Sequence, residues 1–236
     1  YIKEHGYSRH LYEFKDEYAN IDLLMYRKMR KKAYTMFKKE RSELYFRKST
    51  PAKKIQKYYR ALSMEQDRRS PHHYFNSVKE VTGKVFVDVG CAEGYSSLEI
   101  IEEAKHVYLF EQDEQWLEAI RATFEPWQDK VTIVQKYVSD HNSSREQTLD
   151  DFFNNQTNEH LFLKMDIEGA ERHALAGCNN LFQNCQKLDF AICTYHLRDD
   201  EEVISAFLDK HNCTYINQKG FFRHKIRSVV MRGSKK

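Results

Sequence analysis

The chain has 236 residues, of which 41% are hydrophobic and 14% aromatic, so it is long and apolar enough for one packed α/β domain with an additional segment. No uninterrupted apolar run reaches the roughly 18 residues of a transmembrane helix, and we expect no membrane span. The formal charge of +3 is unevenly distributed: residues 1–80 hold 20 Lys and Arg against 10 Asp and Glu, and the remainder holds 18 against 25. A basic front part suits either an anionic partner or the ordinary solvation of long helices.

Residues 1–82 are predicted to form a basic helical segment. Between Leu11 and Lys48, apolar residues recur at steps of three and four, the stripe of an amphipathic helix. Pro51 then marks the first position of a further helix. We expect these two or three helices to cover the acceptor side of a site or to form the interface of a homo-oligomer, and the sequence does not choose between these roles. The apolar stripe consists of Leu11, Phe14, Tyr18, Ile21, Met25, Met29, Ala33 and Phe37.

Residues 83–236 are predicted to form a second unit with a Rossmann-like, doubly wound α/β fold. Short apolar strands alternate with amphipathic helices, the pattern of a mainly parallel sheet with helices on both faces. The last two strands have no helix between them and are expected to form an antiparallel hairpin. The seven expected strands lie at residues 85–89, 107–111, 131–138, 161–166, 189–194, 213–218 and 225–232.

The cysteines form no C-x-x-C pair, and their odd number, spread over expected strands and helices, is typical of a reducing compartment. This predicts a cytoplasmic protein. None has a Cys or His neighbour at the close spacing of a zinc site. The five cysteines are Cys91, Cys178, Cys185, Cys193 and Cys213.

The most informative stretch is Val85–Gly94, where a buried strand runs into two glycines and a helical pattern begins at Tyr95. Such a turn presents backbone N–H groups to a nucleotide-type cofactor. A dinucleotide fingerprint would need glycine where Ala92 stands, and no P-loop motif occurs, so the spacing favours a nucleoside cofactor without phosphates. The expected cofactor contacts in this turn are Asp88, Gly90, Cys91, Ala92 and Gly94.

Two later strand ends complete the expected cofactor site. Glu111 ends the second strand, where a carboxylate can accept hydrogen bonds from both ribose hydroxyls, and Gln112 follows it. Ser139 and Asp140 end the third strand segment, within reach of an adenine amino group. For Asp140, the role of a plain turn carboxylate is an equal alternative.

These motifs carry a family resemblance. Val87–Gly94, Val138–Asp140, Thr148–Phe152 and above all Lys164–Glu171, read as Lys-x-Asp-x-Glu-Gly-Ala-Glu, resemble the FkbM family of S-adenosylmethionine-dependent methyltransferases. Ile192–His196 continues the match. The resemblance implies S-adenosylmethionine as methyl donor and transfer to hydroxyls of sugars or of secreted natural products. The family's usual Ala-Asn pair is replaced by Cys91 and Ala92, so a side-chain amide is absent here.

Methylation of an alcohol requires removal of a proton as the new bond forms, so a base or a metal is expected near the methyl group. His196 follows the fifth strand and is the expected base, with a surface or packing role as its alternative among 11 histidines. Asp166 and Glu168 are expected beside it, with Asp166 touching the cofactor's amino group or orienting the acceptor. These groups and Glu171 also have the chemistry to hold Mg²⁺, although Glu171 at a helix start has a plain electrostatic explanation. Lys164 is expected to pair with a neighbouring carboxylate or with an acidic substrate.

The leading hypothesis is therefore an O-methyltransferase for a saccharide or a similar polyhydroxylated acceptor. An RNA methyltransferase that uses the basic front segment is a second hypothesis, which is disfavoured because the aromatic residues there follow a helical spacing typical of a buried face. A non-catalytic assembly protein with a vestigial cofactor fold is a third, and intact Asp88, Glu111 and Asp166 argue against it. The front-segment aromatics are Tyr34, Phe37, Tyr45, Phe46, Tyr58 and Tyr59.

Overall fold

The computed structural model describes residues 12–19, 26–28, 34–38, 42–48, 50–154, 159–222 and 225–235. Its centre is a seven-stranded sheet with the strand order β11-β12-β10-β9-β4-β5-β6. The pairs among β10, β9, β4, β5 and β6 are parallel, whereas β12 pairs antiparallel with both β10 and β11. The strands are β4 (Val85–Val89), β5 (His106–Phe110), β6 (Val131–Val134), β9 (His160–Met165), β10 (Lys187–Cys193), β11 (Thr214–Phe222) and β12 (Lys225–Lys235). The predicted doubly wound sheet with its C-terminal hairpin is confirmed.

One predicted strand, residues 131–138, is divided in two. After β6 the chain forms β7 (Tyr137–Val138), which pairs in parallel with β8 (Glu146–Gln147) outside the main sheet. This break redirects the chain before Ser139 and Asp140.

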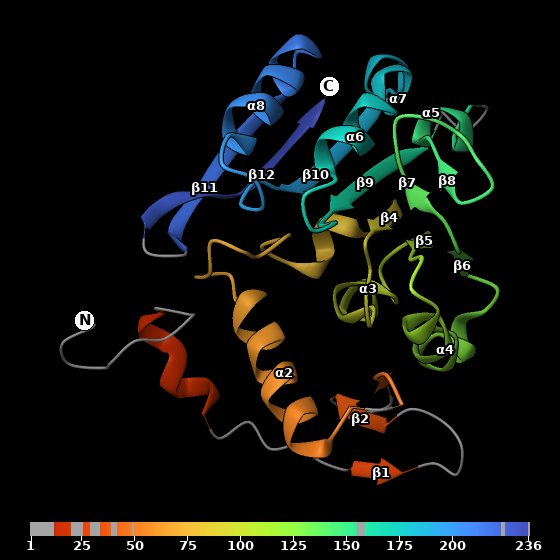
Figure 1. The fold of residues 1–236 in the computed structure, drawn as a ribbon, viewed down its shortest axis with the longest axis vertical. Coiled ribbons are helices and arrows are strands. Elements are labelled where there is room, and N and C mark those ends of the chain that lie inside the picture. The colour runs from red at the N-terminus through yellow and green to blue at the C-terminus, as the bar shows by residue number, and fades with distance from the viewer. Residues whose placement is uncertain are drawn as a thin grey trace.

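Helices cover both faces of the main sheet, α3 and α4 on one side and α5 to α8 on the other (Figure 1). Because side chains alternate along a strand, each face has its own core. Phe86 and Phe162 pack with Ile55 on the first face, and Val87 and Leu163 pack on the second. The helices are α3 (Tyr95–Ile100), α4 (Glu114–Thr123), α5 (Leu149–Phe152), α6 (Glu171–Ala176), α7 (Asn179–Asn184) and α8 (Asp200–Lys210), with 3-10 turns η2 (Val78–Val81) and η3 (Glu125–Trp127).

The predicted helix between residues 11 and 48 is wrong where the chain is described. The segment contains a 3-10 turn, η1 (Glu13–Tyr18), and an antiparallel sheet of β1 (Tyr26–Lys28), β2 (Tyr34–Lys38) and β3 (Ser42–Tyr45). Aromatic and β-branched residues favour strands, and packing decides between the two periods. The stripe positions Leu11, Ile21, Met25, Met29 and Ala33 lie outside the described residues.

Packing of β3 against the main domain explains this outcome. Leu44 and Phe46 are each 1% exposed and lie in the first-face core, while the intervening Tyr45 packs against α4. The backbone N–H of Tyr45 donates to Thr123 Oγ1 at 3.0 Å. Burial of every second side chain is the period of a strand. Packing against the main domain therefore determines the structure here, and the helical spacing of the apolar residues does not.

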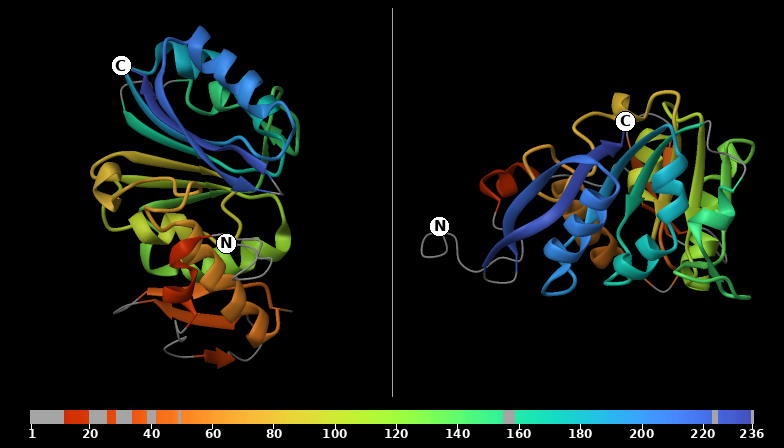
Figure 2. Two further views of the ribbon diagram at one scale, coloured as in Figure 1. Left: turned by 90° about the vertical axis from the view of Figure 1, so that its left-hand side faces the viewer. Right: turned by 90° about the horizontal axis from the view of Figure 1, so that it is seen from above.

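The helix expected after Pro51 is confirmed as α2 (Ala52–Glu65). Together with β1 to β3 it lies on the side of the sheet that carries α3 and α4 (Figures 1 and 2). Both roles expected for the front segment, covering the acceptor side of the site and forming a homo-oligomer interface, stay predictions. In the described part of the chain, no helix combines the length and apolar character needed to cross a bilayer.

Candidate active site

The sheet topology places the expected site at the carboxyl edge of its central strands. From β4 the chain proceeds to β5 and β6 on one side, whereas β9 and β10 lie on the other. The strand order therefore reverses beside β4, and ligands of open α/β sheets bind at such a switch point. The connections after β4, β5, β9 and β10 contain Gly90, Glu111, Asp166 and His196.

The turn after β4 requires glycine at two positions. Gly90 has φ of 78°, and a Cβ there would lie 2.1 Å from the carbonyl oxygen of Asp166. Gly94 has φ of 81°, and a Cβ there would lie 2.7 Å from the ring of Phe124. The turn closes with a hydrogen bond from the N–H of Gly94 to the carbonyl of Cys91, and Ala92 adopts a left-handed φ of 47°. The backbone thus approaches the neighbouring strand end more closely than a side chain would allow.

Glu111 is held against this turn. Its Oε2 accepts a hydrogen bond from the N–H of Ala92 at 3.1 Å, and its Oε1 accepts one from the N–H of Asp113 at 2.8 Å. Gln112 follows it, half-buried, in the connection to α4. The carboxylate expected at the ribose and the glycine turn therefore form one hydrogen-bonded unit.

A buried ion pair lies below the turn. Asp88 and Lys164 face each other across the β4–β9 pair, with Nζ of Lys164 2.8 Å from Oδ1 of Asp88. Lys164 also donates to the carbonyl of Gly90 at 2.8 Å, and Ser97 Oγ donates to Asp88 Oδ2 at 2.6 Å. Burial would lower the pKa of Lys164, but the charges of Asp88 and Asp166 raise it above its usual value. Of the two partners expected for Lys164, the structure shows a neighbouring carboxylate.

His196 lies in a cluster of carboxylates after β10. Its Nδ1 is 2.9 Å from Oε1 of Glu171, and its Nε2 is 3.5 Å from Asp166 and 3.6 Å from Glu168. The His196 side chain is 6% exposed and that of Glu171 is fully buried, whereas that of Glu168 is 93% exposed. Burial would lower the pKa of His196, but the three carboxylates raise it overall. The structure therefore brings together the three residues expected to be catalytic.

Asp166 accepts hydrogen bonds from the hydroxyl groups of two tyrosines that no sequence motif indicated. Tyr74 donates to Oδ2 at 2.6 Å, and Tyr195 donates to Oδ1 at 3.3 Å. Burial would raise the pKa of Asp166, but the positive charge of Lys164, together with His72 and the Tyr74 hydrogen bond, lowers it. Tyr74 belongs to the segment between α2 and β4, so residues before the sheet contribute to this centre.

Ser139 and Asp140 lie on the α6 side of the site. The N–H of Ser139 donates to the carbonyl of Gln147 at 3.0 Å. The carboxylate of Asp140 lies 2.8 Å from His141 and 3.3 Å from His173, and these rings lower its pKa to about 2. These two ring contacts agree with the alternative role of Asp140 as a turn carboxylate. Its contact with the adenine stays a prediction.

Donors for a cation occur twice around Asp166. Asp166, Glu171 and His196 form one group and His72, Asp166 and Cys193 another, with ligand atoms within 4.8 Å of one another in each. In the first group, Glu171 Oε1 already accepts from the N–H of Ile167 at 2.9 Å and pairs with the imidazole. Because the imidazole of His196 and the N–H of Ile167 already engage this carboxylate, the donor set fits a carboxylate–imidazole cluster better than a dedicated Mg²⁺ site.

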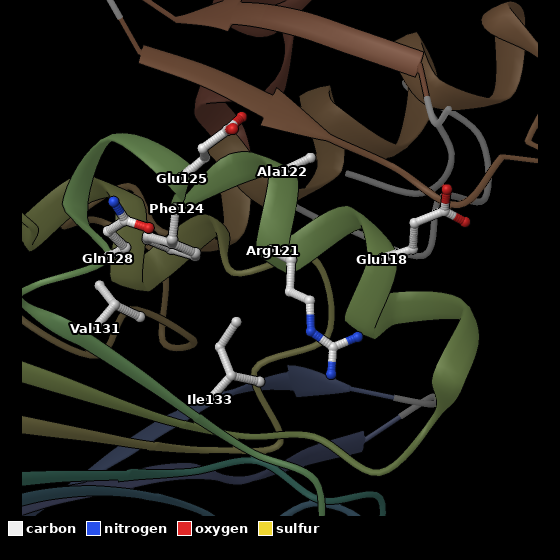
Figure 3. Close-up of a pocket in the computed structure, with 8 residues that line it drawn as sticks. All are labelled: Glu118, Arg121, Ala122, Phe124, Glu125, Gln128, Val131 and Ile133. Atoms are coloured by element: carbon white, nitrogen blue, oxygen red, sulfur yellow. The ribbon is translucent and has the colours of Figure 1, made fainter. Parts of the chain in front are cut away.

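A cavity of about 450 Å³ lies away from these residues, between α4 and the edge strand β6. In Figure 3, Arg121 extends from α4 into the same space as Ile133 of β6. Phe124, whose ring also restricts Gly94, forms part of its wall. We locate the active site at the strand ends, because the glycine turn and the titratable clusters meet there. The cavity is lined by Glu118, Arg121, Ala122, Phe124, Glu125, Gln128, Val131 and Ile133.

A seven-stranded, mainly parallel sheet with a glycine turn after β4 and an acid after β5 places the chain in the class of Rossmann-like proteins that bind nucleoside-containing cofactors. A family model described as the methyltransferase FkbM domain matches residues 88–216, more than half of the chain. The chain therefore belongs to the FkbM methyltransferase family.

Solved structures agree with this fold. The chain is similar to the FkbM methyltransferase of Methylobacillus flagellatus KT, with 20% identity and a TM-score of 0.51 over 64% of this chain and 43% of that one. It is also similar to the magnesium protoporphyrin IX methyltransferase of Synechocystis PCC 6803, solved with bound S-adenosylmethionine, with 12% identity and a TM-score of 0.50 over 80% and 86% of the two chains. The chain thus spans less than half of the Methylobacillus protein. No curated protein matches it.

Proposed function

We propose that this methyltransferase transfers a methyl group to a hydroxyl of a saccharide or a similar polyhydroxylated acceptor, as a cytoplasmic enzyme. The observation that carries the proposal is the His196–Glu171 pair at the carboxyl edge of the sheet, with Nε2 of His196 directed to the side of Asp166 and Glu168. All five cysteines are free thiols, which suits a reducing compartment.

The residues present fit S-adenosylmethionine. Gly90 lets the backbone of the turn lie directly against the strand end at Asp166, and Glu111 lies against the same turn with a carboxylate suited to ribose hydroxyls. Ser139 and Asp140 would lie on the adenine side. When bound, the cofactor supplies an electrophilic methyl group for in-line displacement, so the protein's task is to align the acceptor and to accept its proton.

His196 has the surroundings of a general base. Glu171 Oε1 lies 2.9 Å from Nδ1, and Nε2, which is buried and has no hydrogen-bond partner among the described residues, would take the proton of an acceptor hydroxyl bound against it. The developing imidazolium is stabilised by Glu171, Asp166 and Glu168, the groups that raise the pKa of His196. Asp166, which accepts a hydrogen bond from Tyr74, lies 3.5 Å from this second nitrogen.

A neutral, hydroxyl-rich acceptor suits the charge of the rim. The exposed carboxylate of Glu168 accepts hydrogen bonds from hydroxyl groups but repels phosphate. The RNA hypothesis loses support because three of its six aromatics, Phe46, Tyr45 and Tyr59, are 1%, 8% and 8% exposed and cannot serve as stacking platforms for bases, which leaves Tyr58, at 40%, as the exposed one among those whose side chains are described.

The proposal is tested with S-adenosylmethionine labelled in the methyl group, offered with neutral oligosaccharides or with unrelated RNA. We expect label in the oligosaccharide, retained after mild alkali because a methyl ether survives treatment that removes a methyl ester. Label confined to RNA, or removed by alkali, would refute the proposed acceptor.

A further inference from the structure

The glycine turn contains a buried carboxyl group that the cofactor contacts described above do not use. Glu93 lies between Cys91 and Gly94 and is only 3% exposed. Among the described residues, its Oε2 has no hydrogen-bond partner. A buried carboxylate oxygen without a partner is costly, because it has lost its hydrogen bonds to water without gaining others.

Charges around Glu93 are unbalanced. Asp88 and Lys164 both act on its carboxyl group, and Lys164 already pairs with Asp88 at 2.8 Å. Glu111 and Asp166 add two further carboxyl groups around the turn, at the ends of the adjacent strands. Because Lys164 already pairs with Asp88, Glu93 has no cation of its own at a place where a ligand is expected, and this arrangement favours a ligand with positive charge.

Apart from Lys164, the described side chains named below that interact with the Glu93 carboxylate carry no positive charge. Tyr58 of α2 and Tyr95 of α3 interact with its carboxylate, as does the thiol of Cys91, and each of these groups is neutral or anionic. The N–H groups of Glu93 and Tyr95 favour its charged form but contribute less than burial does.

We infer that Glu93 is the counter-ion for the positively charged methionine end of the cofactor, and that the cofactor's cation displaces a proton from this carboxyl group into solvent. The inference rests on the cofactor and not on the proposed acceptor. Two groups of S-adenosylmethionine offer the required chemistry, the α-ammonium and the sulfonium.

The protonation state of the free protein supports this coupling. Burial raises the pKa of Glu93 to about 7, so roughly half of the molecules carry a proton there at pH 7. A cation bound beside the carboxylate lowers its pKa and expels that proton. Release should therefore be about half a proton per site at pH 7 and should disappear well above pH 8, where the free carboxyl group is already ionised.

Isothermal titration calorimetry in two buffers of different ionisation enthalpy measures this release. The full chain and its Glu93→Gln variant are titrated with S-adenosylmethionine and with S-adenosylhomocysteine, which keeps the ammonium but lacks the sulfonium charge. We expect the variant to lose the released proton and to bind about tenfold more weakly, equal to about 1.4 kcal/mol. Subtracting the variant's result removes proton exchange by the ligand's own amino group.

Release with both ligands identifies the ammonium, and release with S-adenosylmethionine alone identifies the sulfonium. Glu118→Gln, the same change at an exposed site on α4, serves as control and should keep both affinity and proton release. A thermal unfolding scan of Glu93→Gln should show a fold at least as stable as the wild type, since a buried ionisable group is removed.

Binding by the wild type without this pH-dependent release, or an unchanged affinity in Glu93→Gln, would overturn the inference. A wild type that binds neither ligand would instead contradict the cofactor assignment itself.

Discussion

Lys164→Met is expected to destabilise the fold by about 3–5 kcal/mol, because it leaves Asp88 as an unpaired buried charge. The Lys164 and Asp88 side chains are 5% and 1% exposed, so water cannot replace the lost ammonium group. The variant also loses the hydrogen bond to the Gly90 carbonyl, so cofactor binding should weaken together with stability. Urea unfolding followed by circular dichroism measures the change.

Lys84→Met is the matched control for this variant. Lys84 pairs with Asp189 at 2.6 Å, but the two side chains are 17% and 24% exposed. Partial exposure lets solvent compensate, so the loss should be about 1 kcal/mol or less. If both variants lost the same free energy of unfolding, the buried Lys164–Asp88 pair would contribute no more to stability than the partly exposed Lys84–Asp189 pair.

His196→Gln is expected to lower kcat by about 10²- to 10⁴-fold, the contribution of a general base, with cofactor affinity largely retained. His160→Gln changes a histidine at the start of β9, at the opposite end of that strand from Asp166, and it should leave kcat unaltered. Steady-state kinetics together with cofactor titration separates the two parameters. Unchanged turnover in His196→Gln would eliminate this residue as the base.

The pH dependence of turnover follows from the raised pKa of His196. Only the neutral imidazole accepts a proton, so kcat should rise with pH through a value above the ordinary pKa of about 6.5. Glu171→Gln removes the partner 2.9 Å from Nδ1 and should shift this rise to lower pH while it reduces kcat. The imidazolium stabilises the fold below the unfolded-state pKa, and that contribution is lost as pH rises through the folded-state pKa.

The turn that is expected to hold the cofactor could be predicted because its signals are local. Gly90 and Gly94 stand directly after a strand, and Glu111 terminates the next one. The structure shows the same order, with Gly90 at φ of 78° and Glu111 bound to Ala92. A turn encoded by residues that are neighbours in sequence can be read without knowledge of the tertiary packing.

Long-range packing could not be predicted in the same way. Tyr74 reaches Asp166 from 92 positions earlier and belongs to no motif. Aromatic residues between 11 and 48 happen to follow a helical spacing. In the structure, however, the side chains of Leu44 and Phe46 are buried in alternation, as at the end of a strand. The pairing of β3 with β2 and its packing against α4 cannot be inferred from residues that are neighbours in the sequence.

The measurement that tests the account most directly is a titration of the wild type and of Glu111→Ala with S-adenosylhomocysteine, followed by thermal unfolding. A ligand at 100 times its Kd adds about 2.7 kcal/mol of stability to the protein that binds it. We expect a clear rise in Tm for the wild type. For Glu111→Ala, the same rise should require a ligand concentration at least ten times higher. No rise in the wild type, or an identical response in both proteins, would contradict a cofactor site at the glycine turn.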